Sequence, residues 1–280
     1  MPDIPFQLRN AYNSGRLIPF IGAGVSMSVR WTDPGPPPCT RRGPSWTELV
    51  NRAALDLGFA DPALLRARGT DLQILEYYRI KHYGEAARLT NWLHLTMQPP
   101  DSALQASPIH KALAGLDNIK LIYTTNFDDF IERSFKIHKR EHKVIAVEAD
   151  MMSSDVCEII KFHGDLNHPN AMVLSESDYE KRLSFSTPMD YRLRADLLNR
   201  ALLFIGYSFR DYNVSYLFRL MNDTLAQATG AMRERRAYIT VPDPSDFEFE
   251  LFSTRNIEVI PINGARMTED IADILSDLGS

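Results

Sequence analysis

Four short segments hold residues whose types and spacing could do chemistry, and the first of them is a glycine-rich turn. It reads Phe20-Ile-Gly-Ala-Gly-Val-Ser26. Gly22, Ala23 and Gly24 allow a tight turn that brings backbone N–H groups to a pyrophosphate, and the Ser26 hydroxyl adds a donor. A glycine turn after a strand is often only a turn. Met27 replaces the third glycine of the dehydrogenase fingerprint, so the pattern disfavours a hydride-transferring enzyme.

The second segment is Tyr123-Thr-Thr-Asn126-Phe-Asp128-Asp129, which follows another apolar run. Helix capping explains the two aspartates, because either can accept hydrogen bonds from the first turn of the next helix. Capping does not explain Asn126. Its amide is expected at the carboxyl end of a strand, where open α/β sheets bind their ligands.

Two further segments end apolar runs in the same way. In Ile160-Lys-Phe-His163-Gly164-Asp165, the imidazole has a pKa suited to acid–base catalysis, although a lone histidine is more often structural. Gly164 leaves room for a substrate beside it. In Leu203-Phe-Ile-Gly206-Tyr-Ser208, Gly206 and Ser208 could contact a ribose or a phosphate. A simple strand-to-helix turn explains that segment equally well.

Short apolar runs alternate with amphipathic stretches, which predicts a Rossmann-like α/β fold with a mostly parallel sheet and helices on both faces. The expected core strands are Leu17–Ile21, Lys120–Tyr123, Glu158–Phe162, Ala201–Ile205, Ala237–Val241 and Ile257–Ile262. The expected helices are Trp46–Leu57, Asp71–His82, Glu85–Met97, Ile109–Leu116, Asp129–Phe135, Asn213–Ala226 and Glu269–Leu278. Residues 46–116 show no strand signal, so we expect a helical insertion lobe there within one domain of residues 1–280.

The proline-rich stretch from Asp33 to Pro44 breaks this alternation. Proline fixes φ and removes a hydrogen-bond donor, so the stretch cannot be a helix or a central strand. It is either a surface loop or, because it follows the glycine turn directly, a lid over a bound cofactor. The H-x-x-E-H pattern from His138 to His142 is typical of a zinc protease, but it stands in a charged run and is expected to be a solvated connector.

The composition of the 280 residues is that of a soluble globular protein, with 44% hydrophobic residues, 24% charged residues and a net charge of −5. This charge gives no reason to expect binding to nucleic acid or to a membrane. The two cysteines, Cys39 and Cys157, cannot form a four-cysteine zinc site, and we expect no bound metal. Neither a secretory leader nor a membrane span is evident, which favours the cytoplasm.

Together and in this order, the four segments resemble those of the sirtuin superfamily, and most closely its bacterial sirtuin-like domains without a zinc module. The similarity extends over about residues 15–262 and includes Gly43–Leu49 and Met172–Tyr179. In that family, Gly22, Ala23, Gly24 and Ser26 match the phosphate-binding loop, and Asn126 matches the residue that positions water and the nicotinamide ribose. Asp128 matches the aspartate near nicotinamide, and His163 the catalytic base. The other matched cofactor-binding positions are Thr125, Gly206 and Ser208.

The chain departs from the family pattern at two places. No cysteine pair lies between His163 and Gly206, so the zinc ribbon of the protein deacylases is missing. The proline-rich stretch replaces their arginine-bearing cofactor loop, which leaves the role of Arg30, Arg41 and Arg42 open. The adenine-ribose contact could be formed near Thr240 or at Ile262-Asn263, and the sequence does not decide between them.

The resemblance implies an NAD⁺ hydrolase that cleaves the nicotinamide–ribose bond and depletes NAD⁺ in bacterial antiphage defence. It also implies a separate sensor protein, such as a HerA-type ATPase or a short Argonaute, or self-assembly into a homo-oligomer. Two other functions remain open at this stage. One is an NAD-dependent protein deacylase or ADP-ribosyltransferase, and the other is a non-catalytic NAD or ADP-ribose sensor subunit.

Overall fold

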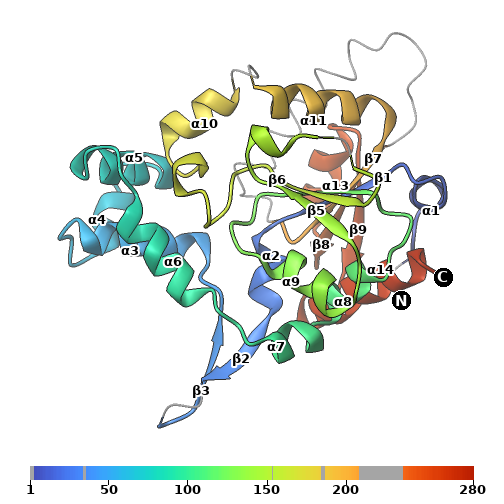
Figure 1. The fold of residues 1–280 in the computed structure, drawn as a ribbon, viewed down its shortest axis with the longest axis horizontal. Helices are drawn as coiled ribbons and strands as arrows, with labels where there is room; N and C mark the ends of the chain where they lie inside the picture. Colours follow the sequence, from blue (N-terminus) through green and yellow to red (C-terminus); the bar gives the residue numbers. More distant parts are fainter. Residues whose placement is uncertain (1–2, 34–35, 153, 184–186, 208–235) are drawn as a thin grey trace.

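A sheet of seven parallel strands forms the centre of the computed structural model, which describes residues 3–33, 36–152, 154–183, 187–207 and 236–280 (Figure 1). Its spatial order is β5-β6-β4-β1-β7-β8-β9, and every neighbouring pair is parallel. The strands are β1 (Leu17–Ile21), β4 (Leu121–Thr124), β5 (His142–Ile145), β6 (Cys157–Lys161), β7 (Ala201–Ile205), β8 (Ala237–Pro242) and β9 (Ile257–Ile262). The expected α/β fold is therefore confirmed.

Helices cover both faces of this sheet, because the strand residues alternate between two buried clusters. Leu17 and Ile21 of β1 belong to the cluster that includes α1 (Phe6–Asn13), α8 (Pro108–Ala114), α9 (Phe130–Ile137) and α14 (Met267–Leu278). Ile18 and Phe20 belong to the cluster that includes α11 (Pro188–Asn199) and α13 (Asp246–Ser253). Successive side chains of a strand point to opposite faces, so this alternation builds a three-layer domain.

The stretch from 46 to 116 is helical throughout, as the sequence predicts. It comprises α3 (Trp46–Asp56), α4 (Pro62–Arg66), α5 (Asp71–Lys81), α6 (Ala87–Thr96), α7 (Asp101–Ala106) and α8. Capping boxes begin α3 and α5, where Ser45 pairs with Glu48 and Thr70 with Gln73. The lobe ends earlier than expected, however. Leu113 of α8 is buried in the sheet cluster with α14, so α8 belongs to the helical layer of the sheet.

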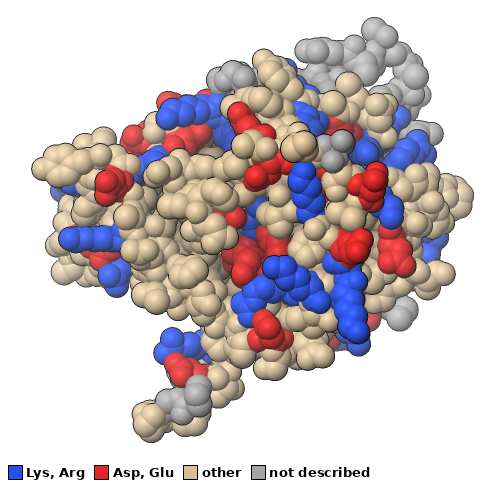
Figure 2. All heavy atoms as spheres, viewed as in Figure 1, with Lys and Arg blue, Asp and Glu red and all other residues tan. Residues whose placement is uncertain are grey.

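Three sequence predictions require correction. The sheet has seven strands rather than six, because β5 begins at His142, inside the stretch expected to be a connector. The proline-rich stretch from Asp33 to Pro44 contains β3 (Cys39–Arg42), which pairs antiparallel with β2 (Arg30–Asp33). This hairpin projects away from the body instead of lying over it (Figures 1 and 2). Helices α1, α2 (Ala23–Ser28), α10 (Glu176–Leu183), α11 and α13 were also not expected.

Some predictions fall on residues that the structure does not describe. Ser208 and the expected helix Asn213–Ala226 lie outside the described residues. Within the described part, no helix is both long and apolar enough to cross a bilayer.

Candidate active site

The register of the sheet places all four sequence motifs at one edge. Ile21 of β1 pairs with Thr124 of β4 on one side and with Ile205 of β7 on the other. Thr124 in turn pairs with Lys161 of β6. Asn126 lies two residues after Thr124, and His163 lies two residues after Lys161. Gly22 and Gly206 directly follow Ile21 and Ile205. The carboxyl ends of these four strands thus bring the predicted residues together, where open α/β sheets bind ligands.

The glycines of the first and fourth motifs are packed against each other. The N–H groups of Gly22 and Gly24 donate to the carbonyl oxygens of Ile205 and Gly206, both at 2.8 Å. A Cβ atom on Gly24 would lie 2.9 Å from the Cα atom of Gly206. Gly206 itself has φ +75°, a conformation that favours glycine. These glycines therefore allow two backbone segments to touch, and two N–H groups of the expected phosphate loop, those of Gly22 and Gly24, are already hydrogen-bonded.

Ser26, Asn126 and Asp128 form a buried hydrogen-bond network between the first two motifs. The Ser26 hydroxyl donates to Oδ2 of Asp128 at 2.6 Å and accepts from Nδ2 of Asn126 at 2.8 Å. The same Nδ2 also donates to the Gly22 carbonyl at 3.0 Å. All three side chains are buried. Among the residues that the structure describes, Oδ1 of Asn126 has no hydrogen-bond partner, so this oxygen is the one polar atom of the amide left to receive a ligand or a water molecule.

Thr125 is held in a second, smaller network that the sequence did not reveal. Its hydroxyl lies 3.0 Å from the hydroxyl of Tyr207, which donates to the Ile21 carbonyl at 3.1 Å. Thr124 also donates to Ile21, at 3.0 Å, and its oxygen accepts from the backbone N–H of Asn126. These bonds fix the path of the backbone on either side of Asn126. In the fourth motif Tyr207 lies between Gly206 and Ser208, and this position is the one signal in the sequence that could have identified it.

His163 is almost fully buried, with 3% of its surface exposed, and aromatic rings surround it. The ring of Phe162 lies 5.8 Å away, and that of Tyr179 meets it edge-on at 5.3 Å. Arg182, one helical turn beyond Tyr179 on α10, stacks its guanidinium over Phe162 at 4.9 Å. Burial, followed by the positive charge of Arg182, lowers the pKa of His163 to about 3. The imidazole is therefore neutral near pH 7 and can accept a proton.

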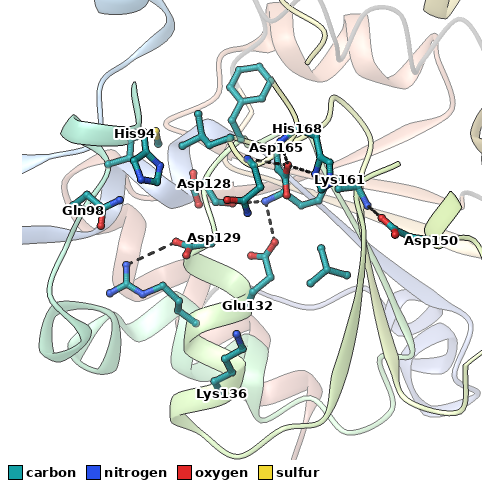
Figure 3. Close-up of a pocket in the computed structure, with 17 residues that line it drawn as sticks. His94, Gln98, Asp128, Asp129, Glu132, Lys136, Asp150, Lys161, Asp165 and His168 are labelled. Carbon is teal, nitrogen blue, oxygen red and sulfur yellow. Dashed lines mark hydrogen bonds and ion pairs between the residues drawn. The ribbon is translucent and has the colours of Figure 1, made fainter. Parts of the chain in front are cut away.

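A cavity of about 360 Å³ opens beside this network (Figure 3). Its lining comes from α9, from the ends of β5 and β6, and from the loop after β6, and it includes Asp128, Glu132, Lys161 and Asp165. A second cavity, of about 390 Å³, is lined by residues that include Met172 and Arg182. Neither is lined by Asn126 or His163. Both side chains are kept from these two cavities, because hydrogen bonds hold the amide and aromatic rings surround the imidazole.

The residues whose roles the sequence left open occupy different surroundings. Thr240 is buried beside β7, with its hydroxyl 3.4 Å from the Phe204 carbonyl, whereas Asn263 caps a short turn by accepting from the Ala265 N–H. Arg41 and Arg42 form ion pairs with Asp33 and Glu48 at the hairpin. Among the residues that the structure describes, no group of three or more His, Cys, Asp or Glu side chains could hold a metal.

Comparisons with known proteins identify the family of the chain. A family model described as "SIR2-like domain" matches residues 120–260. The protein named NAD(+) hydrolase ThsA from Bacillus cereus (strain MSX-D12) is 28% identical over 265 residues, covering 87% of this chain and 50% of that protein. The protein of the same name from Enterococcus faecium is 31% identical over 218 residues, covering 76% of this chain and 41% of the Enterococcus protein. The chain thus spans half or less of the length of these relatives.

A chain from the solved structure "Structural Basis for the Mechanism and Regulation of Sir2 Enzymes" superposes over 99% of this chain and 98% of its own length, with 13% identity and a TM-score of 0.46. That score is too low to bear on the fold. The family model, in contrast, covers just over half of the 280 residues and includes Asn126, Asp128 and His163. The chain belongs to the SIR2-like domain family.

Proposed function

We propose that this chain hydrolyses NAD⁺ at the nicotinamide–ribose bond and releases nicotinamide and ADP-ribose. The observation that carries the proposal is the meeting of Asn126, Asp128 and His163 at one sheet edge, with Oδ1 of Asn126 buried and unpartnered. A neutral imidazole and an amide oxygen are the acceptors needed to orient and deprotonate a water molecule. Relatives that carry the name NAD(+) hydrolase cover most of the chain, which supports the same reaction.

In the proposed reaction the C1′–N bond of the nicotinamide riboside breaks, and its electron pair leaves with nicotinamide. A water oxygen bonds to C1′, and the proton that it loses passes to His163. Oδ1 of Asn126 orients that water, and Asp128 contacts the departing nicotinamide. Gly22, Ala23, Gly24, Ser26, Thr125, Gly206 and Ser208 would hold the rest of the dinucleotide.

Burial of the catalytic groups sets a condition on this mechanism. His163 lies under Tyr179, so NAD⁺ must displace that contact to reach the imidazole. Exposure to water and to the substrate phosphates would then raise the His163 pKa from about 3 toward its ordinary value of 6.5. A base whose pKa approaches the working pH is a more effective catalyst. Substrate binding would thus both uncover and activate the histidine.

The biological role that we propose follows the family resemblance. Residues 1–280 would act as one catalytic domain in the cytoplasm and deplete NAD⁺ during antiphage defence. The activating signal would come from a separate sensor, such as a HerA-type ATPase or a short Argonaute, or from assembly of several copies of this chain.

The test is to incubate the purified chain with NAD⁺, alone and together with the product of its neighbouring gene, and to quantify nicotinamide and ADP-ribose by chromatography. We expect the two products in equal amounts. Transfer of ADP-ribose to a protein would instead indicate a transferase. Tight NAD⁺ binding with no nicotinamide release under either condition would indicate a sensor subunit.

A further inference from the structure

We propose that Lys161 is a positioning residue, which fixes the loop bearing Asn126 and Asp128 against the end of β6, directly before His163. This inference rests on the proposed function, because it concerns the geometry of the same site. Neither the sequence motifs nor the reaction described above assigns Lys161 a role.

Lys161 links three elements of the site through one ammonium group. It is the last residue of β6, two residues before His163, and its side chain is 1% exposed. Its Nζ donates a hydrogen bond to the backbone carbonyl oxygen of Asp128. The same nitrogen forms an ion pair at 3.0 Å with Oε1 of Glu132 on α9. The loop after β4, helix α9 and strand β6 therefore meet at this single atom.

The charge of Lys161 is maintained despite its burial. Desolvation lowers the pKa of the ammonium, but Glu132, Asp128 and Asp165 together raise it above its ordinary value. A buried ammonium is unfavourable unless acceptors and opposite charges surround it. Lys161 has both, so it stays protonated and retains its hydrogen bond to the Asp128 carbonyl at neutral pH.

That hydrogen bond completes the fixation of Asp128. Its Oδ2 atom accepts from Ser26, and its Oδ1 atom accepts from the Phe130 N–H at 3.1 Å. Lys161 holds its carbonyl oxygen. Asp128 is thus constrained from the glycine loop, from α9 and from β6. Since Asn126 lies only two residues earlier, the same contacts limit how far its amide can move relative to His163.

The cavity beside the site makes this role testable by chemical rescue. Lys161 and Glu132 line it, and in Figure 3 their charged ends point toward one another. Removing the lysine side chain would extend this cavity to the carbonyl of Asp128. A small primary amine that enters from solvent could then donate the missing hydrogen bond. A quaternary ammonium ion has the same charge but no N–H to donate.

The first experiment measures NAD⁺ hydrolysis by the Lys161→Ala variant. A displacement of about 1 Å in a catalytic group costs on the order of 10²-fold in rate, so we expect kcat to fall by about that factor, with the KM for NAD⁺ little changed. Propylammonium should raise the kcat of this variant about tenfold, because it supplies both the charge and the N–H donor. Tetramethylammonium should restore nothing.

A matched pair of double variants separates positioning from general stability. Lys161→Met with Glu132→Leu removes both charges of the site pair, which avoids leaving one buried charge unpaired. Arg192→Met with Glu158→Leu removes another ion pair that involves β6, at the opposite end of the strand from His163. We expect the second variant to keep its activity and the first to lose it, although both melt close to the unmutated chain.

Hydrogen–deuterium exchange provides a readout that needs no activity. In the first double variant, residues 121–130 should exchange faster, while β7 and β8 keep their protection. If the unmutated chain hydrolyses no NAD⁺ either alone or with the product of its neighbouring gene, the proposed function fails and exchange alone decides the role of Lys161. Unchanged exchange in residues 121–130 overturns the inference. Full activity in Lys161→Ala also overturns it. The same holds if propylammonium and tetramethylammonium both restore the activity of that variant, or if neither does.

Discussion

The Ser26 hydroxyl lies 2.6 Å from Oδ2 of Asp128 and donates its proton there, although 102 residues separate the two in the chain. The Ser26 hydroxyl oxygen in turn accepts a hydrogen bond from Nδ2 of Asn126 at 2.8 Å. Ser26 follows β1 and Asp128 follows β4, so this contact joins the glycine motif to the Asn–Asp motif. The sequence pattern suggested that Ser26 donates to a phosphate. In this structure its only proton is given to the carboxylate, so binding a phosphate through it would require Asp128 to find another donor.

Replacing Ser26 by alanine should therefore disturb the site more than its small size suggests. Asp128 would lose a donor and Asn126 an acceptor, and leaving buried polar groups unsatisfied costs about 1–3 kcal/mol. We expect NAD⁺ hydrolysis to fall by roughly 10²-fold, as for other groups that orient catalytic residues. The control is Ser28→Ala on the same helix, because that hydroxyl only bonds back to the Val25 carbonyl. Equal activity in both variants would contradict the role of the network.

Gly24→Ala tests whether the glycine loop is required for packing. Its Cβ would lie 2.9 Å from both the Cα and the carbonyl oxygen of Gly206, and backbone atoms cannot easily move away. Overpacking of this kind costs about 1–3 kcal/mol. Gly115→Ala is the matched control, since its Cβ would meet nothing closer than 3.5 Å. Urea denaturation should show a clear loss of stability for the first variant only. If Gly24→Ala is as stable as the control, the loop is free to move from Gly206.

The parts of the fold that could be predicted are those whose local pattern matches their burial. β1 and β7 are short apolar runs, and each is buried along its whole length. β5 was missed because His142, Lys143 and Val144 are only half buried, as is usual at a sheet edge. Nothing in its sequence resembles a strand buried on both faces. The hairpin was missed because prolines dominate the stretch between its strands.

Within the candidate site, residue types could be read from the sequence but their partners could not. The motifs pointed to Asn126 and His163, and the sheet register places them at one edge. No local sequence pattern indicates that Gly24 contacts Gly206, that Ser26 contacts Asp128, or that Lys161 contacts Glu132. Each of these contacts joins residues far apart in the chain, and only the assembled sheet brings them together. Tyr179 and Arg182 were missed because α10 was not predicted.

The depressed pKa of His163 predicts a specific pH dependence of stability. In the unfolded chain a histidine titrates near 6.5, whereas in the folded chain the pKa of His163 is about 3. Between these values the unfolded state binds one more proton, so stability falls as the pH decreases below 6.5, by about 1.4 kcal/mol per pH unit. Above pH 6.5 the group has no effect.

The reference for this measurement is His163→Phe, which keeps an aromatic ring between Phe162 and Tyr179 but cannot titrate. Urea denaturation at pH 7, 6 and 5 should show a shallower decrease for the variant. The slopes of the free energy of unfolding against pH should differ between the two proteins by the equivalent of about one bound proton. Burial also lowers the pKa of His110 to about 4. Because His110 is present in both proteins, its contribution to the two slopes is the same and does not affect their difference. Parallel curves would mean that His163 is not buried as described.

Metal removal should leave the activity intact. The proposed reaction assigns every step to side chains and water, and the described residues offer no cluster of metal ligands. We expect the chain to contain zinc far below one equivalent per molecule by elemental analysis, and to hydrolyse NAD⁺ at the same rate after treatment with a chelator. Stoichiometric zinc that resists mild chelation, or activity restored only by added metal, would contradict this expectation.

The central prediction is that Asn126→Ala and His163→Phe each abolish NAD⁺ hydrolysis for reasons other than unfolding. Catalytic side chains are expected to line a pocket, so that truncating them costs little stability. Burial changes that expectation. Asn126→Ala removes the donor to Gly22 and Ser26, so it should cost about 1–3 kcal/mol. His163→Phe preserves the aromatic packing and should melt near the unmutated chain.

Activity must therefore be compared at a temperature where each variant is fully folded. His163→Phe is the cleaner of the two tests, because it removes the proton acceptor and keeps the ring. General-base help contributes about 10²–10⁴ in rate, so loss of that order with an unchanged melting temperature supports catalysis by the imidazole. Full activity in His163→Phe would remove His163 from the mechanism. If the unmutated chain is silent alone, both variants must be measured with the product of its neighbouring gene, because the proposed defence role implies that the chain is inactive until triggered.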